Sequence, residues 1–546
     1  MLVKSQGLLT TAFAVGLICQ TYSPTYAADA APPVPYISAG FELDQHERSL
    51  ASVVSVDTSA DTAPAAAPPK SEPAVTSQPA VTQVAPASQV PCQQCLPKCC
   101  CTCCTKKKKE ELAAKAKASH KPLHYLNEFS YLNDPCYDGA LLGDGLKNMV
   151  VGPNLKLDFG GQYRARMHSE HNMRGLGLTG NSDDFLLHRT RMYVNAKAGE
   201  NIRFFGEVLD ANSNYESDRP RPIEENRWDA QNLFIDATLY SDGDSKLVAR
   251  GGRQEIALGD QRYVSPLDWA NTRRTFDGGR LMYSGSDWNI DGFWLAPLAR
   301  DTRNFDRANE NQALYGVYTS YKKAENGTLD FYWLAFDNDA AGFQYDSIGS
   351  RYKGKINKML VDLEGAYQLG DNVDGSSHDA GFFTIGMGKA IADSELKTTT
   401  WLYFDWASGD DTQASGNGHH HYQPLAHKYN GFMDLFGRRN LMDLNWLTTM
   451  QLTKKVKLLT WYHSFWLENI NDTPYSVVMT PFAAGIAPDA GHLGQELDLV
   501  LSVGLTPRSN VLFGYSHFWA GNYYDTPGLP TNEDANFFYT QFTTNF

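Results

Sequence analysis

The sequence predicts an all-β protein, in which a disordered N-terminal extension precedes a large antiparallel transmembrane β-barrel of about 18 strands. Three observations predict the barrel. Polar and apolar residues alternate from about residue 155 to the end of the chain. Many of the expected strands reach ten or more residues, which is the length that crosses a membrane at a tilt. The last strand closes on an aromatic residue, Phe546, a feature that resembles the recognition signal of outer-membrane barrels.

The N-terminal residues 1–27 are predicted to be an export signal peptide. Lys4 supplies the positive end, Leu8 to Ile18 the apolar core, and Thr25-Tyr26-Ala27 a small-residue cleavage site, with cleavage expected after Ala27. Residues 28–90 are rich in Ala, Pro, Ser and Val. Such a segment cannot bury enough apolar surface to offset its chain entropy, so it is predicted to be a disordered linker.

Residues 91–150 are predicted to form a Cys-rich and Lys-rich tether with a short helix. Seven of the nine cysteines lie between Cys92 and Cys104. In an exported chain they are expected to oxidise rather than to hold a metal. The Lys106–Lys109 run leads into the helical sequence ELAAKAKASHK. A solvated tether is expected, with contact to the cell wall or to an anionic polymer as the alternative; Cys136 is assigned no role.

The alternation in residues 151–546 has a period of two. Arg164 and Arg166, for example, alternate with Tyr163, Ala165 and Met167. Successive side chains of a strand point to opposite faces, so each strand has one polar and one apolar face. This pattern suits a soluble β-sandwich, whose core is apolar, or an outer-membrane barrel, whose outer face contacts lipid.

Aromatic residues and the last strand favour the barrel. Aromatics gather near the ends of expected strands, as interface girdles do: Trp401, Tyr403, Trp406, Trp461, Tyr462, Trp466, Phe518 and Trp519. In the last strand Phe538, Phe542 and Phe546 share one face, and Gln541, Thr543 and Asn545 share the other. The expected strands are 156–168, 187–199, 201–210, 231–240, 246–256, 279–285, 288–296, 312–321, 328–336, 351–359, 361–369, 381–391, 396–406, 442–452, 455–468, 494–504, 509–519 and 536–546.

An arginine-rich stretch, residues 248–280, is the strongest functional signal. It holds six arginines in a chain whose formal net charge is -14. A guanidinium is always charged and presents a fork of donors that matches a carboxylate. The stretch therefore predicts a local site for anions, with a solvated charged hairpin as the alternative. The acidic balance of the whole chain argues against nucleic acid as a partner.

Several motifs resemble the alginate-export family of outer-membrane barrels. They are GRQEIALGDQR…DWANTRRTFDG, FDWASGD (404–410), HKYNGFMDLFGRRN (427–440), WYHSFW (461–466) and GQELDLVLS (494–502), and they occur in the family's order. The resemblance covers most of residues 155–546. It implies an outer-membrane, 18-stranded monomeric barrel whose arginine-rich constriction passes anionic polysaccharide to the exterior. The N-terminal 150 residues lie outside the resemblance. They are expected to be periplasmic, with export proteins or the cell wall as partners.

The candidate pore residues are basic. Alternation points Arg164, Arg166, Arg189, Arg191, Lys197 and Arg203 into the lumen. Arg250 and Arg253 are three residues apart, so both can face the lumen only with a bulge at Gly251-Gly252. Arg262, Arg274 and Arg280 of the same stretch are further candidates, and the resemblance adds Arg438 and Arg439. Interleaved acids are expected to pair with these bases and to fix their directions: Asp158, Glu207, Asp236, Asp362, Glu364, Glu496 and Asp498.

Polyuronates carry a carboxylate on each sugar, so transit needs attraction that is spread over many weak sites. A general anion-selective porin for small solutes is the nearest alternative, and a structural protein that links the outer membrane to the cell wall is another. An enzyme is not expected, because His463 and Ser464 face opposite ways on one strand and no other catalytic set converges. No cofactor is expected. The loop with His419-His420-His421 is predicted to be solvated rather than to bind a metal. Asp410-Asp411 is likewise predicted to lie in a solvated surface loop rather than to bind a cation.

Overall fold

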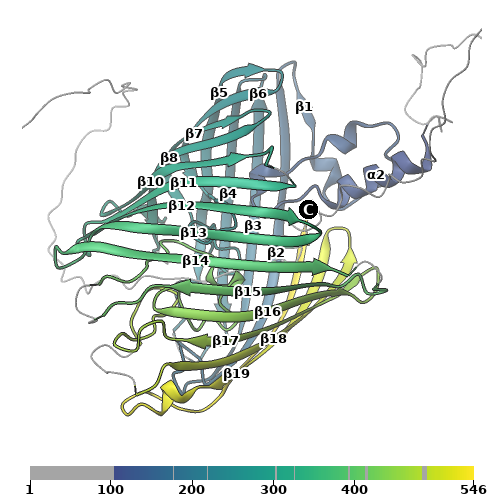
Figure 1. Cartoon of the computed structure of the whole chain (residues 1–546). Helices are drawn as coiled ribbons and strands as arrows, with labels where there is room; N and C mark the ends of the chain where they lie inside the picture. Colours follow the sequence, from purple (N-terminus) through teal and green to yellow (C-terminus); the bar gives the residue numbers. More distant parts are fainter. Residues whose placement is uncertain are drawn as a thin grey trace, which may run out of the picture. The chain divides into compact units, whose positions relative to one another are not determined.

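The structure, a computed structural model, describes residues 104–175, 177–217, 219–301, 304–324, 326–391, 394–411, 416–482 and 489–546. The predicted signal peptide, the linker over 28–90 and six of the seven clustered cysteines lie outside these residues. The described chain forms a closed barrel of 18 long antiparallel strands, each paired with its neighbours in sequence (Figure 1). The predicted fold class is confirmed.

The barrel closes where the last strand, β20, pairs with the first long strand, β2, so that Arg166 lies opposite Gln541. Two short strands extend the sheet: β1 (Met149–Val151) pairs with the start of β2, and β9 (Arg307–Ala308) pairs with the end of β8. The 18 barrel strands are β2 Leu155–His171, β3 Asp183–Ala198, β4 Ile202–Asn214, β5 Asn226–Asp242, β6 Ser245–Gln254, β7 Phe276–Ser284, β8 Trp288–Ala299, β10 Gln312–Tyr321, β11 Gly327–Asn338, β12 Phe343–Ile356, β13 Met359–Asp371, β14 Ser377–Ala390, β15 Thr399–Ala407, β16 Leu441–Gln451, β17 Val456–Trp466, β18 His492–Thr506, β19 Ser509–Ala520 and β20 Ala535–Asn545.

The alternation of the sequence becomes the two faces of the barrel wall. On β2 and β3, Met167 and Met192 are exposed on the outer face, whereas Arg166 and Arg191 are buried inside. On β20, Phe538 is exposed and Gln541 is buried. An apolar outer face with a polar interior is the arrangement of an outer-membrane barrel in contact with lipid. No helix among the described residues is long and apolar enough to cross a membrane.

Part of the predicted aromatic girdle is wrong. Trp401, Tyr403, Trp461 and Phe518 are buried on the inner face, where they join one large apolar cluster. The cluster exists because loops fold into the barrel and cover these rings with apolar side chains such as Phe436. Alternation alone assigns a face but not what covers it.

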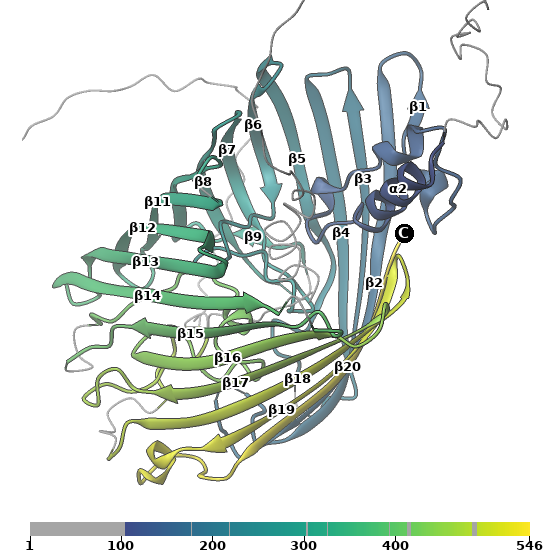
Figure 2. The same ribbon diagram turned by 45° about the vertical axis from the view of Figure 1, so that its right-hand side comes forward.

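The two ends of the barrel differ in the length of their connections. At one end, turns such as 243–244, 357–358 and 507–508 are short, and both the N-terminal segment and the C-terminal residue lie there (Figure 2). We call this end the short-turn mouth. At the other end the longest connections are 255–275, 408–440 and 467–491. The strand predicted over 351–359 crosses the turn at 357–358, because β12 begins earlier, at Phe343.

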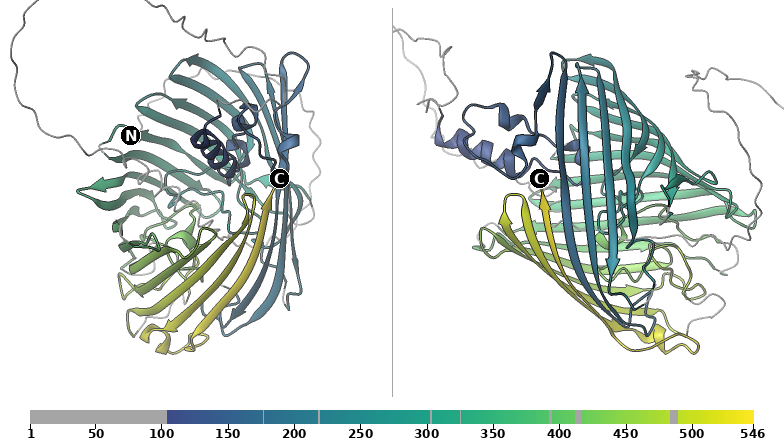
Figure 3. Two further views of the ribbon diagram at one scale, coloured as in Figure 1. Left: turned by 90° about the vertical axis from the view of Figure 1, so that its right-hand side faces the viewer. Right: turned by 180° about the vertical axis from the view of Figure 1, so that it is seen from behind.

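Residues 104–147, the N-terminal unit, pack beside the chain's C-terminal end (Figure 3). Helix α2 (Lys106–Lys117) begins inside the lysine run because the Thr105 hydroxyl caps it by accepting from the Lys108 backbone N–H. The short 3₁₀ helices η1 (His124–Leu126), η2 (Ser130–Asn133) and η3 (Asp144–Leu146) follow. Cys136, to which the sequence assigns no role, forms a disulfide with Cys104. The unit has its own apolar cluster around Leu112 and Phe129, which a solvated tether would lack.

Candidate functional site

Residues 255–275, which join β6 to β7, form a constriction loop that folds into the barrel against the β2–β3 wall. The Arg164 guanidinium donates to the backbone carbonyls of Asp268, Trp269 and Ala270 at 2.7, 2.9 and 2.8 Å. The Arg189 guanidinium donates to the carbonyls of Asp268 and Ala270 at 2.9 and 3.0 Å. Burying a guanidinium costs several kcal/mol unless its donors are bonded. The wall arginines and the loop carbonyls therefore hold each other in place.

Trp269 is the aromatic centre of the constriction loop. The Arg166 guanidinium lies 3.4 Å from the centre of the Trp269 ring and donates to its backbone carbonyl at 2.8 Å. The His427 ring stacks on the tryptophan at 4.3 Å. A cation over an indole face is attracted by the electrons of the ring. This contact fixes where the loop meets the wall.

A second group of arginines meets the N-terminal unit inside the barrel. Arg191 bonds Glu207 at 2.6 Å and Glu255 at 3.2 Å, and it also donates to the Pro122 carbonyl at 3.1 Å. Arg273 pairs with Glu255 and donates to the same Pro122 carbonyl at 3.2 Å. The N-terminal unit thus supplies acceptors to arginines of the proposed pore.

Residues 123–125, with the carbonyl of Pro122, form the plug tip of that unit. The Arg203 guanidinium donates to the Tyr125 carbonyl at 2.7 Å, and the Tyr125 hydroxyl donates to the Glu255 carbonyl at 2.9 Å. Leu123 and Tyr125 pack in an apolar cluster with Phe205 and other inward-facing rings. The His124 ring lies 3.1 Å from a carboxylate of Glu207. Burial and nearby Arg191 lower the pKa of His124 to about 4, so the ring is neutral at pH 7.

A further basic group surrounds the turn at Asp260 in the constriction loop. Arg351 and Lys353 of β12 pair with the Asp260 carboxylate at 2.9 and 2.5 Å. Burial alone would raise the pKa of Asp260, and its neighbours Arg351, Lys353 and Lys428 lower it well below its ordinary value. Arg262 bonds Glu364 at 2.6 Å. The carboxylates here neutralise the bases and tie the loop to the opposite wall.

The seven acids of the predicted set divide into two classes. In the first class each carboxylate accepts from an inward-facing side chain. Asp158 accepts from Asn195, Glu207 from Arg191, Asp236 from Arg250, and both Asp362 and Glu364 from Arg262.

Glu496 and Asp498 do not pair with an arginine among the described residues. Glu496 accepts the Met433 backbone N–H at 2.9 Å, and Asp498 accepts that of Phe432 at 3.3 Å. Backbone N–H groups of the loop at 427–440 therefore donate to these two acids of β18. The expected pairing with arginine is therefore wrong for Glu496 and Asp498, and Asp158 bonds Asn195 instead.

Arg250 and Arg253 both reach carboxylates without the predicted bulge. Arg250 bonds Asp236 at 2.7 Å, and Arg253 bonds Asp277 at 2.9 Å. The pairing of β6 with β7 runs through Gly251 and Gly252 with no shift of register. Instead Gly252 adopts a φ of +124°, where an added Cβ would lie 2.4 Å from the Leu233 carbonyl oxygen. Glycine adopts this positive φ without a steric clash, and the backbone changes direction there, between the two arginines.

The other predicted pore residues lie in different settings. Arg280 pairs with Asp291, and Arg438 bonds Asp405 at 3.1 Å. Arg274 donates to the carbonyls of Ser265, Gln423 and Pro424. Arg439 lies 4.3 Å from the centre of the Tyr475 ring. Lys197 is exposed near the end of β3 at the short-turn mouth.

The constriction loop meets the connection 408–440 where Val264, which is buried, forms a β-bridge with Gln423. His419 and His421 are buried there, and the His419 ring bonds the Arg438 carbonyl at 2.7 Å. The predicted solvated histidine loop is therefore wrong, because the loop folds inward. Asp410, also predicted to be solvated, is buried and accepts the Gly416 N–H at 2.9 Å. No group of three metal-ligating side chains occurs in the part of the chain that the structure describes.

Four basic residues at the constriction were missing from the predicted set. Arg273 belongs to the arginine-rich stretch itself. Arg351 and Lys353 alternate on an expected strand, and that alternation carries the same signal as Arg164 and Arg166 on β2. Lys428 lies in the motif at 427–440, from which Arg438 and Arg439 were predicted and Lys428 was not.

Comparisons with known proteins agree with this architecture. Residues 155–538 match the model of a protein family described as alginate export. OccAB1 of Acinetobacter baumannii aligns with a TM-score of 0.50 over 71% of this chain and 96% of its own, at 11% identity. The outer membrane protein OprD of Pseudomonas aeruginosa aligns with a TM-score of 0.48 over 71% of this chain and 94% of its own, at 9% identity.

At 11% identity the OccAB1 alignment shows a shared fold alone. No curated protein matches the chain by sequence. The family match spans more than half of the chain and begins at the first barrel strand, which leaves the N-terminal unit outside it. The chain belongs to the alginate-export family and is an outer-membrane β-barrel channel for solutes.

Proposed function

We propose that this channel conducts an anionic polysaccharide such as a polyuronate, or related anionic solutes, along its inward-facing arginines. One observation supports it most. Where the constriction loop meets the β2–β3 wall, five guanidinium groups lie together, and their ion pairs among the described residues are with the carboxylates of Glu207, Glu255 and Asp268. The five arginines are Arg164, Arg166, Arg189, Arg191 and Arg273.

The partners of these arginines suit exchange with a passing carboxylate. Arg164 and Arg166 form no ion pair among the described residues; they donate to loop carbonyls and to the Gln541 amide oxygen. A carboxylate is a stronger acceptor for a guanidinium than a neutral carbonyl. A uronate chain can therefore displace such partners one at a time, so that many weak steps replace one tight site.

The asymmetry of the connections supports an orientation for the proposed channel. Outer-membrane barrels place short turns in the periplasm and long loops outside the cell. By that rule the N-terminal unit lies on the periplasmic side, where export partners or the cell wall would meet it. A polymer delivered from the periplasm would enter at the short-turn mouth.

The test is the reversal potential of the full chain in planar bilayers under a salt gradient, followed by addition of a uronate oligomer. We expect anion selectivity and saturable block, both weakened when Arg164, Arg166, Arg189 and Arg191 are replaced by alanine. The matched control is Arg227→Ala, because this arginine is exposed and its ion pair is with Asp210 of β4. Anion selectivity without block would show a general anion porin. Cation selectivity would contradict the arginine-lined path.

A further inference from the structure

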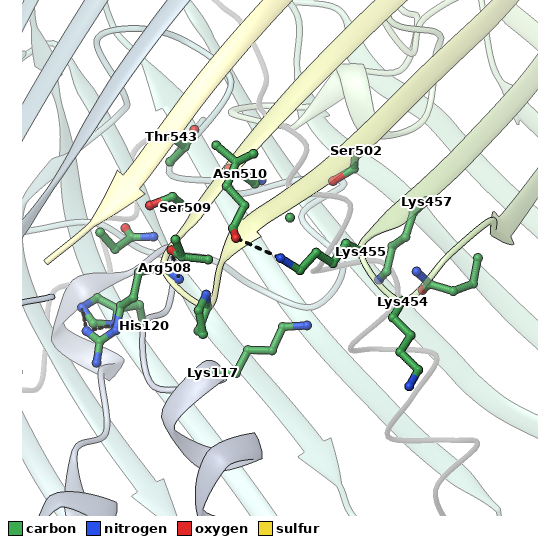
Figure 4. Close-up of a pocket in the computed structure, with 16 residues that line it drawn as sticks. Lys117, His120, Lys454, Lys455, Lys457, Ser502, Arg508, Ser509, Asn510 and Thr543 are labelled. Carbon is green, nitrogen blue, oxygen red and sulfur yellow. Dashed lines mark hydrogen bonds between the residues drawn. The ribbon is translucent and has the colours of Figure 1, made fainter. Parts of the chain in front are cut away.

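A cationic vestibule lies at the short-turn mouth, between the N-terminal unit and the barrel rim. Its cavity volume is about 310 Å³, within the range of small-molecule sites of about 300–1,000 Å³. Sixteen residues line it, including five cations and no Asp or Glu. The cations are Lys117, Lys454, Lys455, Lys457 and Arg508 (Figure 4). In a chain with a net charge of -14, a wall without acids predicts attraction of anions.

Three of the lysines keep their charge available. Among the residues that the structure describes, Lys117, Lys454 and Lys455 form no ion pair; Lys455 donates to the Leu505 carbonyl at 3.3 Å. Lys117 ends helix α2, and the other two lie in the turn between β16 and β17 (Figure 4). Arg508 differs, because it bonds Asp144 of the N-terminal unit at 2.5 Å. That ion pair holds the two walls of the vestibule together.

The vestibule opens toward the barrel interior and not toward lipid. Lys457 pairs with Ser502, and each lies two residues from a buried inward residue, Leu459 and Val500. A strand repeats its faces every two residues, so both side chains face inward. Asn510 and Thr543 are paired in the same way on β19 and β20. The lining therefore combines lysines with hydroxyl and amide groups. This combination suits a ligand that carries both carboxylates and sugar hydroxyls.

We propose that the cationic vestibule binds a carboxylate-bearing saccharide chain at the short-turn mouth, with the N-terminal unit supplying part of the site. This inference rests on the proposed function and adds a docking site that precedes the arginines. A membrane lipid is a poor fit because the lining strands present their inward face. Several lysines spread over the cavity engage several carboxylates at once, so an oligomer binds more tightly than a single uronate.

The test measures equilibrium binding of a fluorescent uronate oligomer to the full chain, with monomeric uronate and an uncharged oligosaccharide as competitors. The variant carries Lys117→Gln, Lys454→Gln and Lys455→Gln. Loss of three partly solvated contacts is expected to raise the Kd about tenfold. The matched control removes three exposed lysines from other short turns and strand ends, Lys358→Gln, Lys389→Gln and Lys397→Gln, and is expected to leave the Kd unchanged.

A second measurement locates the ligand directly. A carbodiimide condenses a uronate carboxylate with a lysine amine and releases the carboxylate oxygen as the urea, so bound oligomer becomes fixed to the lysines that it touches. Mass spectrometry is expected to find the sugar on Lys117, Lys454 or Lys455.

The outcomes separate the vestibule from the proposed function. If the oligomer blocks the current and the triple variant binds it as the wild type does, the vestibule is overturned and the channel function stands. If the monomer competes as well as the oligomer, a site for a saccharide chain is overturned. If the wild type neither binds the oligomer nor is blocked by it, the proposed function fails as well.

Discussion

The plug tip of the N-terminal unit makes a quantitative prediction about conduction. Tyr125 stacks edge-on against Phe234, with ring centres 5.5 Å apart, and its hydroxyl donates to the Glu255 carbonyl at 2.9 Å. The Arg250 guanidinium lies 4.4 Å from the centre of its ring. Because the tip occupies donors of Arg191, Arg203 and Arg273, its departure would free them for solutes.

Tyr125→Ala removes the ring and the hydroxyl but keeps the backbone carbonyl that Arg203 bonds. Truncation of a buried aromatic ring costs about 3 kcal/mol or somewhat more, and a lost hydrogen bond costs about 1 kcal/mol. Each 1.4 kcal/mol changes an equilibrium tenfold. The ratio of unplugged to plugged channels is therefore expected to rise by two to three orders of magnitude.

Single-channel recording of the full chain measures that ratio as the fraction of time spent in a high-conductance state. Tyr125→Phe is expected to shift it only about fivefold, because the ring remains and about 1 kcal/mol of hydrogen bonding is lost. The matched control is Tyr215→Ala, since Tyr215 is 82% exposed at the long-loop end. Wild-type and Tyr125→Ala channels with equal conductance and equal dwell times would refute the idea that the tip lies in the solute path.

Three further predictions follow from single groups. Arg164→Met removes three hydrogen bonds that hold the constriction loop. The free energy of local opening of the loop is expected to fall by about 1–3 kcal/mol, so the loop's backbone amides exchange hydrogen faster. Unchanged exchange would contradict the anchoring role of Arg164. Cys104→Ser with Cys136→Ser is expected to cost the N-terminal unit about 2–4 kcal/mol, seen as proteolysis of that unit while the barrel resists. Burial and nearby Glu224 raise the pKa of Glu216 to about 7. Between the ordinary pKa of a glutamate and about pH 7, Glu216 keeps its proton in the folded protein and loses it in the unfolded chain. Protonated Glu216 therefore stabilises the folded state at low pH, and this stabilisation is lost as the pH rises through about 7. Thermal unfolding at pH 5 and pH 8 checks this, and Glu216→Gln is expected to reduce the difference.

Alternation made the face of each wall residue predictable. Arg164 and Arg166 face inward because a strand repeats its faces every two residues, and no long-range contact is needed to state it. The strand count and the closing strand β20 follow from the same pattern. The error at 351–359 arose because turn 357–358 has no glycine or proline to mark it.

The partners of the arginines were not predictable in the same way. Arg164 bonds a carbonyl 104 residues further along the chain, and a backbone carbonyl carries no sequence signature. His419 and Asp410 occur in a segment whose composition is that of a solvated loop, yet they are buried. Local composition indicates whether a segment favours a loop, but it does not indicate whether that loop lies in solvent or folds into the barrel.

The sequence by itself determined the barrel, its two faces, the inward direction of the wall arginines and the family. Each depends on local periodicity or on motifs in a fixed order. Only the tertiary structure decided that the constriction loop and the plug tip fold inward and take the arginines as partners, and that Cys104 reaches Cys136. The physical reason is that a wide barrel leaves an interior to be filled, and buried guanidinium groups are stable there only beside acceptors that distant parts of the chain bring to them.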